Sequence, residues 1–294
     1  MIRPNPLVLD DVDGSALPAA LEDVRVIDAH VHLFPDAVFD AIWRWFDTHA
    51  WPVRHRLHSD AVLDFLESRG VKQVVALHYS HKPGMAAALN DYVLAIAKRR
   101  PIAIPTATVL PGEPGDREIL RRALGEGARA IKIHCHVQKL AVDDPRMSVA
   151  FEEAARADVP LVIHCGREPS SDAYGIDARE LCGVDATARM LERHPETTVV
   201  VPHIGSDEFA EYEALLDRFP KLWLDTTMTL GGYFPKGPDL GILKRRSGRL
   251  MYGTDFPNIP YAWDRELKHL VQERLPGDAL AAIAGGNAEK LFSR

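Results

Sequence analysis

Two histidines, His30 and His32, lie two positions apart at the end of an apolar segment, and together they can bind one metal ion. Side chains alternate between the faces of a β-strand, so Asp28, His30 and His32 project to the same side. Neutral imidazole nitrogens are common ligands of divalent metals, zinc in particular. Because a lone His-x-His pair also arises by chance, its meaning depends on partners elsewhere in the chain.

Three later strand-like segments end in further metal-competent side chains. Residues 160–163 precede His164, residues 199–202 precede His203, and residues 250–254 precede Asp255. A water molecule bound to a metal loses a proton near neutral pH, and a nearby carboxylate or imidazole can accept that proton. The pattern therefore predicts a metal-dependent site that is assembled from the ends of several strands.

Short β-branched segments alternate along the chain with segments of helical periodicity. We expect strands at 24–29, 71–77, 102–109, 128–135, 159–165, 197–202, 222–226 and 249–253, and helices at 59–69, 85–99, 116–124, 146–157, 186–194, 207–219 and 239–245. Eight strands that each precede a helix predict an α/β protein with a (β/α)8 TIM-barrel fold. An open doubly wound sheet alternates in the same way, but it gives no reason for metal-competent residues to follow strands one, five, six and eight.

Two stretches fall outside the repeat of what we predict to be one barrel domain over residues 1–294. Residues 1–22 contain three prolines and are expected to wrap the outside of the barrel or cover its bottom. Residues 33–58 follow the first strand and are rich in aromatic side chains. Loops after barrel strands lie at the catalytic face, so this insertion is a candidate lid or dimer surface; the alternative is an ordinary aromatic mini-core.

The composition excludes several classes of protein. With 294 residues, of which 46% are hydrophobic and 26% charged, the chain is typical of soluble globular enzymes. The net charge of −7 argues against a nucleic-acid binder. No apolar segment reaches the roughly 18 residues that a membrane span needs. The first 20 residues lack signal-peptide features and the three cysteines show no paired framework, so we expect a cytoplasmic protein.

These motifs resemble those of the amidohydrolase superfamily. The resemblance rests on Asp28-Ala29-His30-Val31-His32, on His164 and His203, and on Tyr252-Gly253-Thr254-Asp255-Phe256-Pro257. The segment Gly-Asn-Ala-Glu-Lys-Leu-Phe at 286–292 is similar to the C-terminal helix of the amidohydrolase 2 branch. That branch includes hydrolases, lactonases and non-oxidative decarboxylases related to aminocarboxymuconate-semialdehyde decarboxylase. The resemblance extends over about residues 24–292.

The resemblance implies that His30, His32, His164 and Asp255 bind one divalent metal, usually zinc, with manganese or another divalent ion as alternatives. His203 would lie beside the metal-bound water as general base or electrostatic partner, and Asp255 could also accept the proton of that water. Asp28 faces the same way one layer deeper. We expect it either to orient His30 or to accept hydrogen bonds from neighbouring backbone amides.

Strand four carries Lys132, followed on the same predicted face by His134 and His136. Binuclear members of the superfamily have a carboxylated lysine on strand four, so Lys132 could bridge two metals. We favour a mononuclear site in which Lys132 pairs with Asp28 or Asp255 inside the barrel. The side chains expected to contact the substrate at the mouth are His134, His136, His78 and Arg167.

The sequence thus predicts a zinc-dependent hydrolase of a small ester, lactone or amide, and the cationic rim favours an anionic substrate. A non-oxidative decarboxylase is the alternative on the same scaffold; we see no separate acid opposite the metal, which favours hydrolysis. A non-catalytic metal-binding interaction module is the second alternative, although structural zinc sites are normally closed by four ligands. No nucleic-acid or membrane partner is expected, and self-association into a homo-oligomer is left open.

Overall fold

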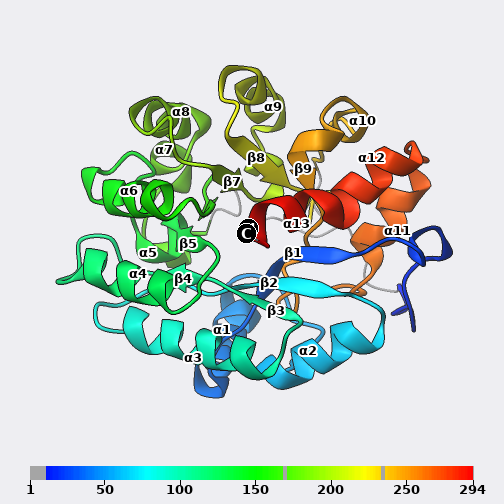
Figure 1. Ribbon diagram of the computed structural model, residues 1–294, viewed down its shortest axis with the longest axis horizontal. Helices are drawn as coiled ribbons and strands as arrows, with labels where there is room; N and C mark the ends of the chain where they lie inside the picture. The colour runs from blue at the N-terminus through cyan, green and yellow to red at the C-terminus, as the bar shows by residue number, and fades with distance from the viewer. Residues whose placement is uncertain (1–10, 168–170, 233–235, 294) are drawn as a thin grey trace.

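A computed structural model of the protein describes residues 11–167, 171–232 and 236–293. A ring of parallel strands lies inside a ring of helices (Figure 1). The strands are β1 (Ile27–His32), β2 (Gln73–Leu77), β3 (Ala103–Pro105), β4 (Ala107–Thr108), β5 (Ile131–His134), β6 (Leu161–His164), β7 (Val199–Val201), β8 (Leu222–Asp225) and β9 (Leu250–Met251). This is the (β/α)8 barrel that the sequence predicts.

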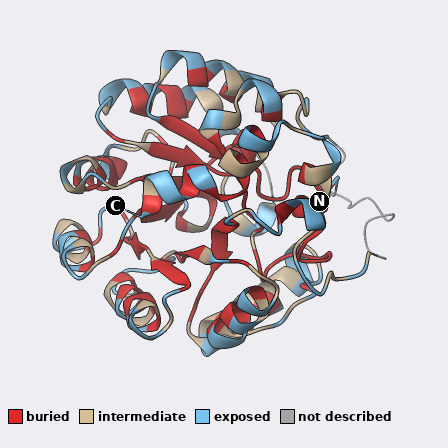
Figure 2. Cartoon of the chain, turned by 45° about the vertical axis from the view of Figure 1, so that its right-hand side comes forward, coloured by how far each residue is buried: buried red, intermediate tan, exposed pale blue. Residues whose placement is uncertain are grey.

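The helices follow the strands along the chain, and the seven that the periodicity predicts are all present. The seven are α2 (Ser59–Ser68), α3 (Ala86–Arg99), α4 (Asp116–Gly125), α6 (Ser148–Ala157), α8 (Val184–Arg193), α9 (Phe209–Arg218) and α10 (Ile242–Arg245). The structure adds α1 (Asp36–His49), α5 (Cys135–Gln138), α7 (Ala178–Leu181), α11 (Arg265–Gln272), α12 (Gly277–Ala281) and α13 (Asn287–Phe292). The outward faces of these helices are exposed and their inward faces are buried (Figure 2).

Parallel hydrogen-bonded ladders close the ring. One sheet has the order β1-β2-β3 and the other runs from β4 to β9, and a bridge between Val31 and Phe256 joins β1 to the segment after β9. The expected single strand at 102–109 is divided at Thr106. Pro105 has no backbone N–H to donate, and the Thr106 hydroxyl instead donates to the Ala76 carbonyl over 2.7 Å.

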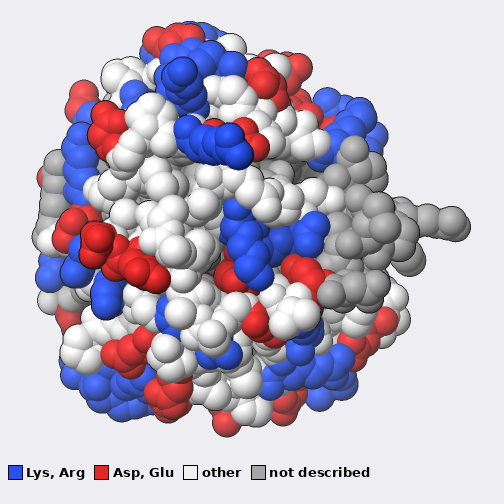
Figure 3. Space-filling view, turned by 90° about the vertical axis from the view of Figure 1, so that its right-hand side faces the viewer, with Lys and Arg blue, Asp and Glu red and all other residues white. Residues whose placement is uncertain are grey.

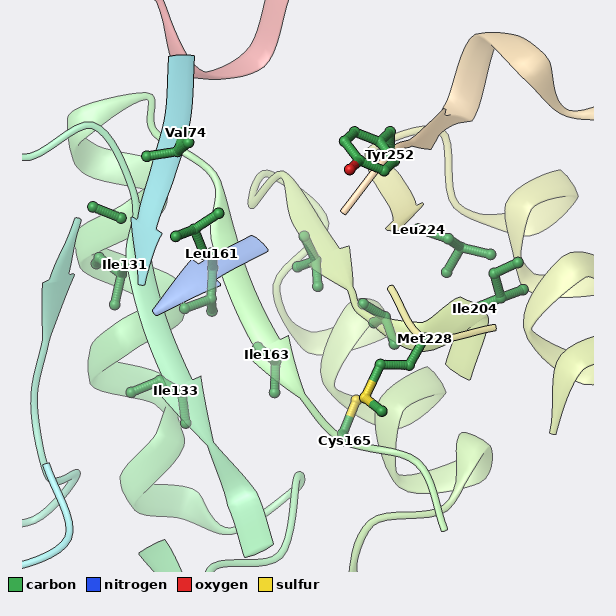
Figure 4. Close-up of a cluster of buried hydrophobic side chains, with 14 of the residues drawn as sticks. Val74, Ile131, Ile133, Leu161, Ile163, Cys165, Ile204, Leu224, Met228 and Tyr252 are labelled. Carbon is green, nitrogen blue, oxygen red and sulfur yellow. The ribbon is translucent and has the colours of Figure 1, made fainter. Parts of the chain in front are cut away.

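The strands are buried on both faces, which explains their nearly continuous apolar sequences. Between strands and helices lies the larger core, with Ile131, Ile133, Leu161 and Ile163 from two adjacent strands (Figure 4). A smaller cluster fills the barrel interior below the strand ends, and Phe292 of α13 packs against it. Helix α13 therefore covers the end of the barrel opposite the site, across the middle of the view in Figure 1.

Both stretches outside the repeat pack against the barrel. From the N-terminal stretch, Asp11 pairs with Arg265 at 3.2 Å and the Gly14 carbonyl accepts from the Trp263 ring at 2.8 Å, so residues 11–22 wrap the outside. Residues 1–10 of that stretch lie outside the described residues. In the insertion after β1, Phe34, Phe39 and Trp43 form a buried mini-core with Val53 and Leu89.

Acidic and basic side chains are interspersed over the face shown in Figure 3. Within residues 11–167, 171–232 and 236–293, no helix has the length and apolarity that crossing a bilayer requires.

Candidate active site

The metal-competent side chains predicted from the sequence meet at the carboxyl ends of the strands. The His30 and His32 rings lie 5.2 Å apart between centroids, and the His164 and His203 rings lie 4.7 Å apart. The His30 and His203 rings are 5.5 Å apart, which links the two pairs. The barrel thus brings side chains from β1, β6, the end of β7 and the end of β9 to one mouth.

His30 is held by a carboxylate that sequence analysis missed. Its Nδ1 lies 3.0 Å from Oδ2 of Asp225, the last residue of β8, and both side chains are fully buried. Burial alone would raise the pKa of Asp225. The electrostatic interaction with His30 and the hydrogen bond to its ring outweigh burial and lower this pKa to about 2. Asp225 ends an apolar strand just as His164 and His203 follow theirs, so the signal that could have found it is present in the sequence.

Asp255 lies against both histidines of β1. Its Oδ1 is 2.8 Å from Nε2 of His32 and 3.4 Å from Nε2 of His30, and its backbone N–H donates to the His30 carbonyl over 2.9 Å. Asp255 has a left-handed backbone conformation (φ 73°), which is rare for a residue with a side chain and typical of functional sites. Burial raises its pKa, but the interactions with His32 and His30 outweigh this and hold it well below its usual range.

The residues present fit a bound divalent metal. Because the Asp225 carboxylate can only accept, Nδ1 of His30 carries the proton and Nε2 carries the lone pair. That Nε2 is buried, has no hydrogen-bond partner and faces a carboxylate oxygen, so two electron-pair donors oppose each other. Burial lowers the pKa of His30 to about 4, which keeps its ring neutral. The ligand atoms of His30, His32 and Asp255 all lie within 4.8 Å of one another.

Asp28 accepts hydrogen bonds from backbone amides and does not contact the His30 ring. It accepts from the amides of His30 and Thr254 at 3.0 and 3.1 Å, and from the Thr254 hydroxyl at 2.6 Å. The Thr254 hydroxyl in turn accepts from the Phe256 amide at 2.9 Å. We expected Asp28 either to orient His30 or to accept hydrogen bonds from backbone amides, and the structure shows the second role. Asp28 joins β1 to the turn that carries Asp255, and Asp225 orients His30.

Lys132 departs from the expected ion pair. Its side chain is fully buried inside the barrel, and Nζ has neither a hydrogen-bond partner nor an ion-pair partner among the described residues. Burial lowers the pKa of Lys132 to about 8, although the charges of Asp225 and Asp255 act in the opposite direction. The predicted pair with Asp28 or Asp255 is therefore wrong. The hydrogen bonds of Asp28 go to His30 and Thr254, and that of Asp255 goes to His32.

His164 and His203 form a hydrogen-bonded pair. Nδ1 of His203 lies 2.9 Å from the Thr227 carbonyl oxygen, which only accepts, so His203 carries its proton there. Nε2 of His203 then accepts from Nδ1 of His164 over 3.1 Å. Burial lowers the pKa of His203 and brings that of His164 well below its ordinary value. A ligand atom of His164 lies within 4.8 Å of ligand atoms of His134 and His136, and His164 is not in the group formed by His30, His32 and Asp255. That His164 binds the same metal as His30 and His32 stays a prediction.

Two of the four predicted substrate contacts are not in the cavity wall. His78 is fully buried, with Nε2 at 2.9 Å from Asn90. His136 is also fully buried, and its Nε2 donates to the Gly166 carbonyl over 2.9 Å. The expected face shared by His134 and His136 is wrong because β5 ends at His134 and α5 begins at Cys135, which ends the alternation of strand side chains.

A cavity of about 1140 Å³ opens at the mouth of the barrel. Its wall includes His32, His134, His164, His203 and Asp255. Sequence analysis anticipated Arg167, which lies 3.6 Å from Glu208, but missed most of the wall. Of the described residues, the wall has the cationic side chains Lys82, Lys139, Arg167, Arg179 and Lys236 and the aromatic side chains Phe34, Trp45, Phe46, Trp51, Tyr79, Tyr174 and Phe209. Asp207 is a second carboxyl in this set besides Asp255.

Fold and site together define a (β/α)8 barrel with a metal-competent cluster at its mouth. A sequence model of the family described as Amidohydrolase matches residues 27–294. The chain therefore belongs to the amidohydrolase family, a family of enzymes. A search among curated proteins found no match.

Solved structures share the fold at low sequence identity. An uncharacterised TIM-barrel protein from Bordetella bronchiseptica is 20% identical, with a TM-score of 0.65 over 91% of this chain and 98% of that one. The 5-carboxyvanillate decarboxylase of Sphingomonas paucimobilis is 18% identical, with a TM-score of 0.63 over 92% and 99%. An amidohydrolase from Burkholderia multivorans with bound zinc is 16% identical, with a TM-score of 0.63 over 91% and 99%.

Proposed function

We propose that this chain is a metal-dependent hydrolase that acts on a small anionic ester, lactone or amide. The observation that carries the proposal is the cluster of His30, His32 and Asp255, of which His32 and Asp255 line the cavity. Three protein ligands with an open fourth position are typical of catalytic zinc, whereas structural zinc sites are closed. This feature also favours an enzyme over a non-catalytic metal-binding module. Zinc is the ion we propose; the amidohydrolase from Burkholderia multivorans that shares the fold contains it.

A zinc ion held by this cluster would lower the pKa of a bound water molecule from about 15.7 toward 7. The chain's own residues can move the proton. Burial lowers the pKa of His203, which favours its neutral ring, and a neutral His164–His203 pair can take up one proton. The carboxylates of Asp255 and Asp225 would stabilise the charge that results, since both act to raise the pKa of His203.

The wall of the cavity supports an anionic substrate with an apolar body. Among the described residues of the wall, five side chains are cationic, namely Lys82, Lys139, Arg167, Arg179 and Lys236, and two are carboxylates, namely Asp207 and Asp255. One of the carboxylates, Asp255, belongs to the metal cluster. Helix α1 and the following loop contribute Trp45, Phe46 and Trp51 to the wall. The insertion after β1 therefore has two roles, as a mini-core on one side and as an apolar wall on the other.

A non-oxidative decarboxylase is the second candidate. The aromatic wall suits an aromatic acid, and the 5-carboxyvanillate decarboxylase of Sphingomonas paucimobilis has the same fold. Asp207 also gives the cavity the separate carboxyl that sequence analysis did not find. We place hydrolysis first because it needs only an activated water beside a polarised carbonyl, whereas decarboxylation also requires a proton to be delivered to carbon.

The test is turnover by purified protein of known metal content, measured on panels of lactones, esters, amides and aromatic acids. We expect hydrolysis that disappears on chelation and returns with zinc. In ¹⁸O-labelled water, label should enter the product acid. Release of CO₂ without such incorporation would contradict hydrolysis and favour the decarboxylase. The double variant His30→Ala/His32→Ala should lose both turnover and metal while keeping its circular dichroism spectrum.

A further inference from the structure

Two tyrosine side chains of the cavity wall, Tyr79 and Tyr174, have no part in the chemistry described so far. Tyr79 follows β2, and Tyr174 ends a short 3₁₀ helix (Asp172–Tyr174) in the loop after β6. Both side chains are partly buried. The two phenol groups therefore reach the same cavity from two different βα loops.

The Tyr79 ring is held in place by three other rings. Its centroid lies 5.6 Å from that of His32, 5.1 Å from that of Phe34 and 4.9 Å from that of His134, and each contact is edge-to-face. Aromatic pairs of this length and orientation are favourable. Because His32 belongs to the candidate metal cluster, these contacts fix the Tyr79 ring beside that cluster.

The Tyr174 ring is supported from two other elements of the mouth. Its centroid lies 5.1 Å from that of Trp45 in α1 and 5.6 Å from that of His136 in α5. The loop after β6 thus packs against the insertion after β1. These contacts position the second phenol ring at the cavity.

Both hydroxyl groups are available to a bound molecule. Within residues 11–167, 171–232 and 236–293, no hydrogen bond joins the hydroxyl of Tyr79 or Tyr174 to another group of the protein. Neither oxygen is among the described polar atoms that are buried without a partner, so both hydroxyls open onto the cavity. A phenol hydroxyl can donate one hydrogen bond.

Both hydroxyls lie within electrostatic range of the metal cluster. Burial raises the pKa of Tyr79 and that of Tyr174 well above the usual range, and the negative charge of Asp255 raises both further. The charge of Tyr174 also raises the pKa of Tyr79, so the two hydroxyls are near each other. A phenol keeps its proton at neutral pH even without such shifts, so both groups are donors there.

We propose that Tyr79 and Tyr174 donate hydrogen bonds to the carbonyl oxygen of the substrate as this oxygen becomes negatively charged during hydrolysis. The inference rests on the hydrolysis proposed above. As the water oxygen bonds to the carbonyl carbon, two electrons of the C=O bond move onto the carbonyl oxygen, and the proton of the water goes to the His164–His203 pair. The C=O bond re-forms when the bond to the leaving oxygen or nitrogen breaks, and the leaving group takes up that proton.

Neutral hydroxyls suit this role because they favour the charged state over the uncharged substrate. A hydrogen bond to an ionised oxygen is about twice as strong as one between neutral groups. Interactions that are stronger in the transition state than in the ground state raise kcat more than they lower KM. Loss of one such donor typically lowers kcat by about 10²–10³-fold.

The first test uses phenylphosphonate, whose tetrahedral anionic group resembles the charged state, and it requires no turnover. Calorimetric titration of zinc-loaded protein measures its affinity. We expect Tyr79→Phe and Tyr174→Phe each to bind it about 10- to 100-fold more weakly, the scale for one hydrogen bond to a charged group. Both variants keep the ring and its contacts, so zinc content should not change. Tyr92→Phe is the matched control, a partly buried tyrosine of α3 outside the cavity wall, and should bind as the wild type does.

A variant that binds phenylphosphonate as tightly as the wild type would overturn the proposal for that tyrosine, and failure of the wild type to bind it would overturn the proposal for both. On a substrate identified by the turnover panels, each variant should lower kcat by about 10²–10³-fold with little change in KM. A higher KM at unchanged kcat would also overturn the proposal. Release of CO₂ without hydrolysis would contradict the proposed function, whereas the phosphonate titration tests the two donors by themselves.

Discussion

Replacement of Asp225 by asparagine should weaken metal binding although Asp225 would not itself contact the metal. The Asp225 carboxylate accepts from Nδ1 of His30 at 3.0 Å, and its other oxygen accepts from the backbone amides of His203 and Thr227 at 3.0 and 3.1 Å. In Asp225→Asn the amide oxygen can keep the two backbone bonds. Its NH₂ group then faces Nδ1 of His30, and two donors would oppose each other.

The two opposing donors can be avoided only if the ring of His30 changes its tautomer. The proton moves to Nε2, the atom that faces Asp255, and the lone pair that the metal needs is lost. Partners that orient a metal-ligating histidine typically account for about 10- to 100-fold in metal affinity. We therefore expect zinc affinity to fall by that factor in Asp225→Asn, or by about 1.4–2.7 kcal/mol.

The measurement is a competition titration against a chromophoric zinc chelator at pH 7, with ¹⁵N NMR reporting the tautomer of His30. Asp28→Asn is the matched control: it alters a second buried aspartate of the same site that contacts backbone amides and a hydroxyl but not the ring. Its zinc affinity should stay within a few-fold of the wild type. Unchanged affinity in Asp225→Asn, or an equal loss in both variants, would refute the tautomer argument.

Three further predictions concern other parts of the site and the fold. His203→Asn should keep most of the zinc at His30 but lower kcat by about 10²–10⁴-fold, as loss of a general base does; loss of that zinc instead would make His203 a ligand. Gly253→Ala should lower zinc affinity and cost about 1–3 kcal/mol of stability in urea unfolding, because the new Cβ would lie 2.9 Å from the His30 Cβ. Gly248→Ala, which meets nothing within 4 Å, is its control. Burial raises the pKa of Glu266 to about 7. The folded state therefore binds the proton of Glu266 more tightly than the unfolded state, and the stability that this proton contributes, which is complete below pH 4.5, is lost as the pH rises through 7. Glu266→Gln should remove a fall of up to about 3 kcal/mol in unfolding free energy between those pH values, and an unchanged pH dependence would contradict this.

The strand ends could be predicted because their signal is local. A short apolar segment followed by a histidine or aspartate shows where a strand ends and which side chain it presents, and this placed His30, His32, His164, His203 and Asp255 at one mouth. Periodicity predicted α2, α3, α4, α6, α8, α9 and α10 for the same reason. The (β/α)8 ring then follows from the order of these elements, without knowledge of any contact between them.

The features that sequence reasoning missed depend on contacts between distant elements. Strand alternation fails after His134 because Gln138, four residues later, accepts from the His134 amide and turns the chain into α5. The side chain of Gln138 also donates to the carbonyls of Ser80 and Val109, which belong to other βα loops. Nor does the sequence show that the carboxylates of Asp28 and Asp255 bond to Thr254 and His32 and leave Nζ of Lys132 without a hydrogen bond.

The identity of a histidine is visible in a sequence, but the nitrogen that carries its proton is not. In this barrel an acceptor outside the site fixes that choice each time: Asp225 for His30, the Thr227 carbonyl for His203, and the Gly166 carbonyl for His136. Nε2 of His203 in turn accepts from Nδ1 of His164, which places the proton of His164 on Nδ1. Because every anchor accepts a hydrogen bond from an N–H group of the ring, the lone pairs of His30, His136 and His164 remain on the opposite nitrogens, which are buried and without partners. The backbone carbonyls and the one carboxylate behind the histidines therefore determine the capacity of the mouth to bind cations as much as the histidines do.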